Sequence, residues 1–286
     1  MANLSNSSAN QSLFGTESPV ALIIGSGVAR VGRCIAEHFR DAGFQVVLHA
    51  HRSVEAAENL VSEWRRNGLA TSLVIGDVSD EDHVGMWREE IAARHGRLDV
   101  LVNSAAIWEP ISLEQATAED FKHFFDVNAL GTALTNQQFG LMMTQQSHGG
   151  AIVNIGDWST IRPYRDFAAY FLSKSSVVSI THSMAVELAT RNPKVRVNAV
   201  LPGPVLLAPE VCEQRRQRII QESLLQREGT PQDVASAALF LATSPFITGV
   251  CLPVDGGRTI YAGPSADPIA HPRVADTTFS NDLRSE

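Results

Sequence analysis

The chain has 286 residues, of which 44% are hydrophobic and 19% are charged, a composition that suits one large α/β domain with a sizeable core. The formal net charge of −8 argues against a nucleic-acid backbone or an anionic membrane as a partner. The three cysteines, Cys34, Cys212 and Cys251, are far apart and form no CxxC pair, so they indicate neither a disulfide framework nor a zinc site. No apolar run approaches the roughly 20 residues that span a bilayer, and we expect a cytoplasmic protein.

The two ends of the chain are polar. Residues 1–18 are rich in Ser and Asn and lack the charged and apolar regions of a signal peptide, so we expect a disordered segment. Residues 263–286 are polar and punctuated by proline, which predicts a flexible tail. Residues 19–262 are predicted to form a single domain.

Within that domain, short apolar runs rich in β-branched residues alternate with longer amphipathic stretches. The runs cover residues 20–25, 44–50, 70–78, 98–103, 151–156, 195–202 and 249–257. The helical stretches include residues 54–67, 81–95, 118–145 and 168–191. Runs that are apolar throughout are typical of parallel strands covered on both faces. The sequence therefore predicts an α/β fold with a doubly wound (Rossmann) sheet of about seven parallel strands, helices on both faces, and a ligand crevice beyond the carboxyl ends of the strands.

The first run leads directly into the glycine-rich stretch GSGVARVGR, residues 25–33. Glycines between a buried strand and a helix let backbone N–H groups approach a pyrophosphate and direct the helix N-terminus at it. An ordinary glycine-rich turn is the alternative, but the position after the first strand of a βαβ series favours dinucleotide binding. The residues expected to contact the cofactor here are Gly25, Gly27, Arg30, Val31 and Gly32.

The end of the second run indicates which dinucleotide binds. An acid placed there would hold the ribose diol of NAD, but the sequence offers His51, Arg52 and Ser53, with no acid before Glu55. A guanidinium, an imidazole and a hydroxyl suit a 2′-phosphate, so NADPH/NADP+ is the predicted cofactor. Alternatively, Ser53 is the N-cap of a solvated helix start, and one serine could both cap the helix and bind the 2′-phosphate. His49 is assigned with His51 to cofactor binding, and the scattered histidines predict no metal site.

Seven motifs of the chain occur in the order seen in short-chain dehydrogenases/reductases, which this sequence resembles from about residue 20 to residue 257. They are the glycine-rich turn, Asp77, LVNSAA (101–106), VNALG (127–131), YFLSK (170–174), LPGPV (201–205) and ITGVCLPVDGG (247–257). The resemblance implies further cofactor contacts from Asp77, Val78, Asn103, Ser104, Ala105, Tyr170, Lys174, Pro202 and Gly203.

The resemblance also implies the catalytic residues. Tyr170 is expected to be the acid/base and Lys174 its partner, which in the family also holds the nicotinamide ribose. Residues four apart share a helix face, so we expect the ammonium to lie near the phenol and lower its pKa. Asn128 matches the family asparagine that anchors a water molecule for proton relay. The alternative is that Tyr170 belongs to the core and Lys174 is a solvated charge.

Asp157 stands thirteen residues before Tyr170, where the family normally has serine. The pteridine reductases and dihydromonapterin reductases make this exchange, and residues 51–53, Arg30 and Trp108 are similar to that branch too. The branch resemblance implies that Arg30, Trp108, Asp157 and Tyr170 bind substrate: the indole would stack on a pterin, and the carboxylate would accept from its N–H groups or deliver a proton. Alternatively, Asp157 hydrogen-bonds Tyr170 in a carbonyl reductase, Trp108 is a lid for any bulky substrate, and Arg30 binds cofactor phosphate.

Three functions follow from these observations. The first is NADPH-dependent reduction of a pterin or dihydropterin, and the second is reduction of a quinone, a ketone or a 3-oxoacyl compound. The third is a non-catalytic NADP(H)-binding sensor, although such proteins usually lose the tyrosine or the lysine. Residues 206–227 are expected to form a substrate lid, and the family resemblance implies a homo-oligomer, a tetramer, built through the long helices and the last strand.

Overall fold

The computed structural model describes residues 2–207 and 211–261, the side chains of residues 2–6 excepted. Its seven strands form one sheet in the order β3-β2-β1-β4-β5-β6-β7, and every pairing is parallel. The strands are β1 Val20–Ile24, β2 Gln45–Ala50, β3 Thr71–Ile75, β4 Val100–Asn103, β5 Gly150–Ile155, β6 Val195–Pro202 and β7 Cys251–Val254. The predicted doubly wound sheet is confirmed, with each strand inside or within one residue of its predicted run.

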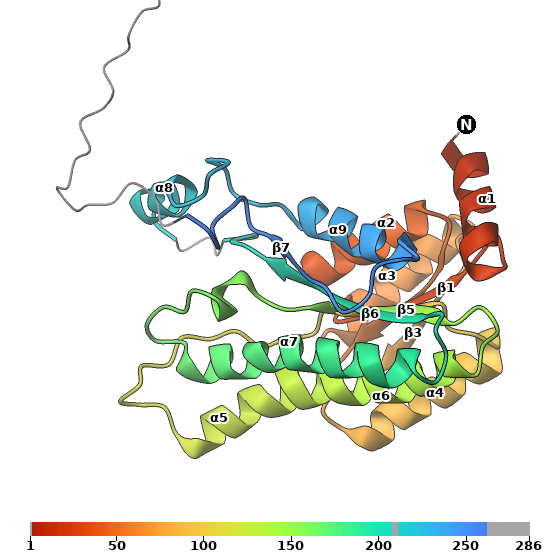
Figure 1. Cartoon of the computed structure of the whole chain (residues 1–286), viewed down its shortest axis with the longest axis horizontal. Coiled ribbons are helices and arrows are strands. Elements are labelled where there is room, and N and C mark those ends of the chain that lie inside the picture. The colour runs from red at the N-terminus through yellow and green to blue at the C-terminus, as the bar shows by residue number, and fades with distance from the viewer. Residues whose placement is uncertain (1, 208–210, 262–286) are drawn as a thin grey trace, which may run out of the picture.

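Helices cover both faces of the sheet (Figure 1). One layer holds α1 Ala2–Phe14, α2 Val31–Asp41, α3 Val54–Arg66 and α9 Pro231–Thr243, and the other holds α4 Glu81–His95, α5 Ala118–Phe125, α6 Gly131–Thr144 and α7 Ala168–Ala189. Because side chains alternate across a strand, β1 supplies Ala21 and Ile23 to the first core and Leu22 and Ile24 to the second. Burial on both faces explains why the strands are apolar throughout.

The stretch 118–145, expected as one helix, is interrupted by a π-helical turn, Asp126–Leu130, between α5 and α6. Such turns are rare and frequently mark functional sites. This one carries Asn128.

The N-terminal segment differs from the expectation of disorder, because residues 2–14 form helix α1. Its last residue, Phe14, is buried and meets the Phe44 ring edge-on, with ring centroids 5.6 Å apart. The side chain of Asn10 donates to the Ala42 carbonyl at 3.0 Å, and the guanidinium of Arg97 donates to the Phe14 carbonyl at 2.5 Å. A polar composition suggested disorder, but one buried ring and two hydrogen bonds hold this segment on the domain. The predicted tail, 263–286, lies outside the described residues.

The carboxyl ends of β1 and β4 meet where the chain order of the sheet reverses, which is where ligands bind in such sheets. The Ser104 N–H donates to the Ile24 carbonyl at 3.1 Å. Gly25 has a φ of +77°, and a Cβ there would lie 2.7 Å from the Ala105 nitrogen. Only glycine therefore lets these two loops come together.

The expected lid segment, 206–227, contains α8 Glu213–Gln221, which stands apart from the two helical layers (Figure 1). Among the helices described here, none is both long enough and apolar enough to cross a bilayer.

Candidate active site

The site is centred on Tyr170, the third residue of α7, which is only 4% exposed. Its hydroxyl donates to Asp157 Oδ2 at 2.6 Å. Asp157 follows β5, and its Oδ1 accepts from the Ser159 N–H at 2.8 Å and from the Ser159 hydroxyl. The acid that the sequence singled out therefore faces the tyrosine, and a short 3-10 turn, Trp158–Thr160, fixes its orientation.

The electrostatics of this pair differ from the sequence expectation. Burial raises the pKa of Tyr170 well above its usual value, and Asp157 raises it further through its charge and its hydrogen bond. The Lys174 ammonium, one helical turn away, is also buried and donates to the Ile155 carbonyl at 2.8 Å. Burial lowers the pKa of Lys174 to about 8, against the opposing effect of Asp157. The expected lowering of the Tyr170 pKa by Lys174 is therefore wrong here: the nearest charged neighbour of the phenol is a carboxylate, so Tyr170 holds its proton.

Asn128 is buried in the π-helical turn and holds two elements of the site together. Its Oδ1 accepts from the Ile107 N–H at 2.9 Å, and its Nδ2 donates to the Ile107 carbonyl at 3.1 Å and to the Ser173 hydroxyl at 3.0 Å. These bonds join the loop after β4 to α7 beside Lys174. The predicted role of Asn128 in proton relay remains a prediction.

An aromatic cluster, formed by Trp108, Tyr164, Phe167 and Phe171, lies beside Tyr170, whose ring centroid is 6.3 Å from that of Phe167 and 5.4 Å from that of Phe171. Trp108 is 48% exposed and stacks on Phe167, with ring centroids 4.9 Å apart. Tyr164 meets Phe167 and Phe171 edge-on. Sequence reasoning found only Trp108. The available signal for the others was the density of aromatic residues between positions 164 and 171.

The glycine-rich turn has the features of a phosphate cradle. Helix α2 begins after Arg30 without a side-chain cap, which leaves the N–H groups of its first turn for a ligand. A Cβ on Gly27 would lie 2.6 Å from Ser53 Oγ, and one on Gly32 would collide with the Gly25 carbonyl. Close backbone packing therefore requires glycine at position 32, whereas at position 27 the nearest atoms belong to the side chains of Ser53 and Ala50. Arg30 and Val31 lie at the start of α2, with Arg30 exposed.

The residues predicted to select the cofactor gather at the ends of β2 and β3. His51 and Arg52 are exposed, and Ser53 makes no capping hydrogen bond with its side chain, so the alternative role as an N-cap is not observed. Asp77 Oδ2 lies 3.8 Å from His51 Nε2. Burial alone would raise the pKa of Asp77, but hydrogen bonds from Ser79 and the nearby His51 outweigh it and lower that pKa.

His49 is not part of this group, and its assignment to cofactor binding is wrong. The side chain is buried, and its Nδ1 accepts from the Gly25 N–H at 3.1 Å. Its Nε2 must therefore carry the hydrogen and donate to the Gly76 carbonyl, 3.1 Å away. Burial lowers the pKa of His49 to about 4, so the ring is neutral and links the ends of three strands.

Asn103 also turns its side chain inward. Its Nδ2 donates to Asn154 Oδ1 at 2.9 Å, and its Oδ1 accepts from the Thr135 hydroxyl at 2.8 Å. A cofactor contact at this position would therefore involve main-chain atoms. The other predicted cofactor residues follow the carboxyl ends of β3, β4 and β6. They are Val78, Ser104, Ala105, Pro202 and Gly203.

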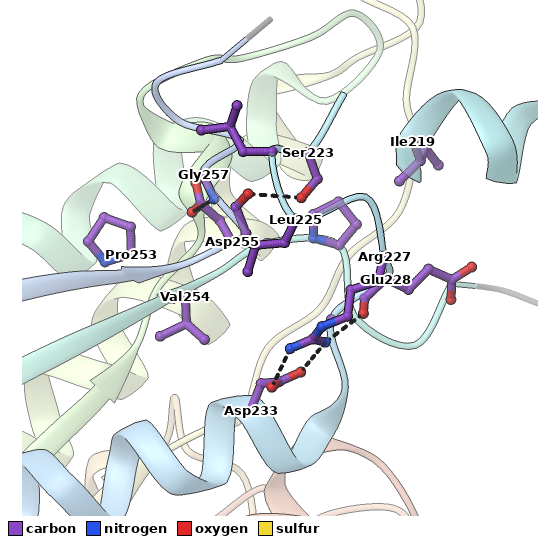
Figure 2. Close-up of a pocket in the computed structure, with 15 residues that line it drawn as sticks. Ile219, Ser223, Leu225, Arg227, Glu228, Asp233, Pro253, Val254, Asp255 and Gly257 are labelled. Atoms are coloured by element: carbon purple, nitrogen blue, oxygen red, sulfur yellow. Dashed lines mark hydrogen bonds and ion pairs between the residues drawn. The ribbon is translucent and has the colours of Figure 1, made fainter. Parts of the chain in front are cut away.

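A hollow of about 430 Å³ lies between residues 219–229 and the end of β7 (Figure 2). Its lining includes the ion pair of Arg227 with Asp233, at 2.8 Å, and the Ser223 hydroxyl, which donates to the Gly256 carbonyl at 2.9 Å. Gly203 lines the hollow, whereas Tyr170 does not. A second hollow, of about 540 Å³, is lined by Tyr164 and Phe171 of the aromatic cluster.

Comparison with known proteins agrees with this geometry. The family described as enoyl-(acyl carrier protein) reductase matches residues 27–259. A 3-oxoacyl-[acyl-carrier-protein] reductase of Synechocystis is 32% identical over 246 residues, covering 85% of this chain and 97% of the relative. Carbonyl reductase family member 4 of Danio rerio is 35% identical over 242 residues, covering 84% and 98%.

Among solved structures, a gluconate 5-dehydrogenase from Burkholderia cenocepacia, in complex with NADP and tartrate, superposes with a TM-score of 0.78 and 28% identity. The match covers 84% of this chain and 95% of that one. The matched residues span the glycine-rich turn, the Asp157 and Tyr170 pair and the last strand, and the chain therefore belongs to the short-chain dehydrogenase/reductase family of oxidoreductases.

Proposed function

We propose that the protein is an NADP(H)-dependent reductase of a carbonyl compound. The observation that carries the proposal is a buried phenol, Tyr170, that keeps its proton and lies at the carboxyl edge of the sheet, one helical turn from Lys174. The names of its relatives, a 3-oxoacyl reductase and a carbonyl reductase, support a carbonyl substrate more than a pterin.

The residues at the sheet edge fit the cofactor. When bound, NADPH supplies the hydride. The backbone of the glycine-rich turn and the uncapped start of α2 would hold its pyrophosphate. His51, Arg52 and Ser53 would hold the 2′-phosphate through charge-assisted hydrogen bonds, and Lys174 would hold the nicotinamide ribose.

In reduction, negative charge develops on the carbonyl oxygen, and Tyr170 is placed to protonate it. A phenol whose pKa is raised keeps its proton until that charge appears. Ser159 fixes Asp157, which in turn orients the phenol. The rings of Trp108 and Phe167 shield one side of the pocket from water, which strengthens the polar interactions inside it.

A pterin or dihydropterin is the second candidate. It is favoured by one observation, the carboxylate of Asp157 facing the pocket residue Tyr170, because a carboxylate suits the N–H groups of a nitrogen heterocycle. The half-exposed ring of Trp108 would stack on such a substrate.

The test follows NADPH absorbance with biopterin, dihydrobiopterin, folate, a quinone, a ketone and a 3-oxoacyl compound, using the wild type and Asp157→Ser. We expect turnover of a carbonyl compound that Asp157→Ser retains or improves, with little turnover of the pterins. Turnover of pterins only, lost in Asp157→Ser, would select the second candidate.

Two controls complete the experiment. Tyr170→Phe should abolish turnover while NADPH still binds, and full activity of this variant would contradict the catalytic assignment. Equal or better catalytic efficiency with NADH would contradict the assigned cofactor. Any measurable turnover would exclude the third function, a non-catalytic NADP(H)-binding sensor.

A further inference from the structure

Two arginines tie the loop of the catalytic acid to a segment 96 residues further along the chain. The guanidinium of Arg258 lies 4.8 Å from the centre of the Trp158 ring, and Trp158 directly follows Asp157. In the opposite direction, Arg162 Nη1 donates to the Arg258 carbonyl at 2.6 Å and also to that of Tyr261. The two segments therefore hold each other through reciprocal contacts.

Trp158 and the catalytic acid belong to one hydrogen-bonded turn. Trp158 is buried and begins the 3-10 turn, of which Asp157 is the N-cap. The Thr160 hydroxyl donates to the Asp157 carbonyl at 2.8 Å, and the Ser159 N–H donates to Asp157 Oδ1 at 2.8 Å. The orientation of the carboxylate toward the catalytic tyrosine is therefore linked to the position of the Trp158 ring.

Arg258 also holds the lid. Its Nη1 donates to the Ile219 carbonyl at 2.7 Å, and its Nη2 pairs with the Glu222 carboxylate. Ile219 lies in α8, and Glu222 is the C-cap of that helix. Directly after it, the Ser223 hydroxyl donates to the Gly256 carbonyl (Figure 2). The C-terminal end of α8 is thus fastened to the segment that carries Arg258.

Arg258 is the side chain at which the lid and the acid loop meet. It is buried, its planar group lies over the Trp158 ring, and two of its nitrogens bind the end of α8. A guanidinium suits this arrangement because it stacks on an aromatic ring and donates hydrogen bonds from its rim at the same time. A displacement of α8 would therefore move Arg258, and through Trp158 it would reach Asp157.

We propose that Arg258 is a positioning residue that couples the lid to the catalytic acid, so that Asp157 keeps its orientation toward Tyr170 only while α8 is in place. This inference rests on the proposed carbonyl reduction and adds a requirement to it, since closure of the lid completes the acid and phenol pair. Coupling between elements is carried by chains of packed and hydrogen-bonded side chains, and the contacts of Arg258 form such a chain.

Amide hydrogen exchange tests the coupling without any substrate. Trp158→Leu removes the ring that lies against Arg258, so we expect the amides of α8 to exchange about tenfold faster, roughly what the loss of one desolvated cation–ring contact gives. Trp158→Phe keeps a weaker ring face and should have a smaller effect, and it carries the test if Trp158→Leu does not fold. The amides of α4 report on the stability of the whole domain and should be unchanged. Unchanged exchange in α8, or an equal increase in α4, would overturn the proposal.

A double-variant cycle separates coupling from simple loosening of the lid. Glu222→Gln breaks the contact of the lid with Arg258. Glu228→Gln is the matched control, because the Glu228 carboxylate pairs with Arg216 of the same helix. Combined with Trp158→Leu, Glu222→Gln should add little to the exchange of α8, whereas Glu228→Gln should add its full effect. Additive effects of Glu222→Gln would contradict the coupling.

The kinetic signature of a positioning role is a change in kcat. Glu222→Gln should lower kcat for the best carbonyl substrate by about tenfold, roughly the effect of one hydrogen bond to a charged group, because Asp157 then loses its fixed orientation. Glu228→Gln should act on KM alone, because it loosens the lid without reaching the acid. Equal kcat values of the wild type and Glu222→Gln would count against the positioning role.

Exchange and turnover together distinguish this inference from the proposed function. If Trp158→Leu releases α8 but no carbonyl compound is reduced by the wild type, the proposed function fails and the coupling stands. If carbonyl compounds are reduced and the exchange of α8 does not respond to Trp158→Leu, the coupling fails and the proposed function stands.

Discussion

At the scale of single residues, burial and one acid determine the electrostatics of the site. Burial raises the pKa of Tyr170 and lowers that of Lys174, whereas Asp157, which stands where the family usually has serine, acts on both pKa values in the upward direction. The two groups respond in the same direction because both prefer their protonated form beside a negative charge. Asp157 therefore extends the pH range in which the tyrosine and the lysine keep their protons.

Removing this charge should move the alkaline limb of the pH profile. A raised pKa keeps a group protonated to higher pH. Asp157→Ser or Asp157→Asn should therefore shift the alkaline decrease of kcat/KM for reduction toward lower pH. The direction is the same whether this decrease reports the deprotonation of Tyr170 or that of Lys174, because Asp157 favours the protonated form of both. The measurement is kcat/KM against pH with the best carbonyl substrate. Asp82→Asn, at an exposed position of helix α4, should leave this decrease at the same pH. An unchanged or raised limb in both Asp157 variants would contradict the assignment.

The sequence indicated the members of this pair but not their electrostatics. A spacing of thirteen residues predicts that Asp157 stands near Tyr170, because the motif lies on the strand, turn and helix of one βα unit. The direction of the Tyr170 pKa shift depends first on burial and then on Asp157, and the spacing of residues in the sequence does not show how deeply a side chain is buried.

At the scale of elements, His49 links the carboxyl ends of three strands. It stands in β2, accepts from Gly25 after β1 and donates to Gly76 after β3. Both bonds require the neutral ring with its hydrogen on Nε2. Because His49 accepts from the N–H of Gly25, the first residue of the glycine-rich turn, the position of the predicted phosphate cradle depends on this link.

His49 should therefore make the fold sensitive to mild acid. Its pKa is about 4 in the folded protein and near 6.5 when unfolded, so the unfolded chain binds the extra proton first. The stability that His49 contributes is complete above about pH 6.5 and decreases by about 3 kcal/mol as the pH falls to 4. Urea denaturation of the wild type and His49→Gln between pH 7 and 4 checks this, since glutamine offers an acceptor and a donor without titrating.

The carboxylates titrate in both proteins, so the difference between the two unfolding free energies reports the contribution of His49 alone. We expect the free energy of unfolding of the wild type to fall more steeply below pH 6.5 than that of His49→Gln. Parallel pH dependences would mean that the imidazole titrates normally and that the strand link is absent.

The elements themselves were largely predictable, and the exceptions have physical reasons. Apolar runs gave the strands, and α4 matches the predicted 81–95 because Asp80 caps its start and Gly96 ends it with a φ of +70°. The π-helical turn was not predictable, since residues 126–130 favour an ordinary helix and tertiary bonds of Asn128 decide otherwise. Helix α1 was missed because its stability comes from Phe14, not from an amphipathic pattern.

At the scale of the whole molecule, β7 forms one of the two edges of the sheet, and β3 forms the other. Strand β7 is last in the sheet order and pairs only with β6, and unpaired strand edges invite association. Large apolar side chains surround this edge: Val186 on α7 is exposed, as are Phe240 on α9 and Phe246 in the following loop. These residues define the β7 face, and Figure 1 shows α7 and α9 on either side of that strand.

We propose that the β7 face joins two copies of this chain, in line with the homo-oligomer that the family resemblance implies. A contiguous apolar surface with aromatic side chains is typical of association sites. A charge placed in the centre of such an interface loses its hydration without gaining a partner, so Phe246→Asp together with Phe240→Glu should give a smaller species. Sedimentation velocity at micromolar concentration measures this, with Met86→Glu on α4 as the control, because Met86 is about as exposed as Phe240 but lies on a helix remote in sequence from β7. A wild type that sediments as a monomer, or a double variant that keeps the wild-type size, would contradict the assignment. Retained NADPH binding by the smaller species would show that the cradle in the middle of the sheet, between β1 and β4, forms within one chain.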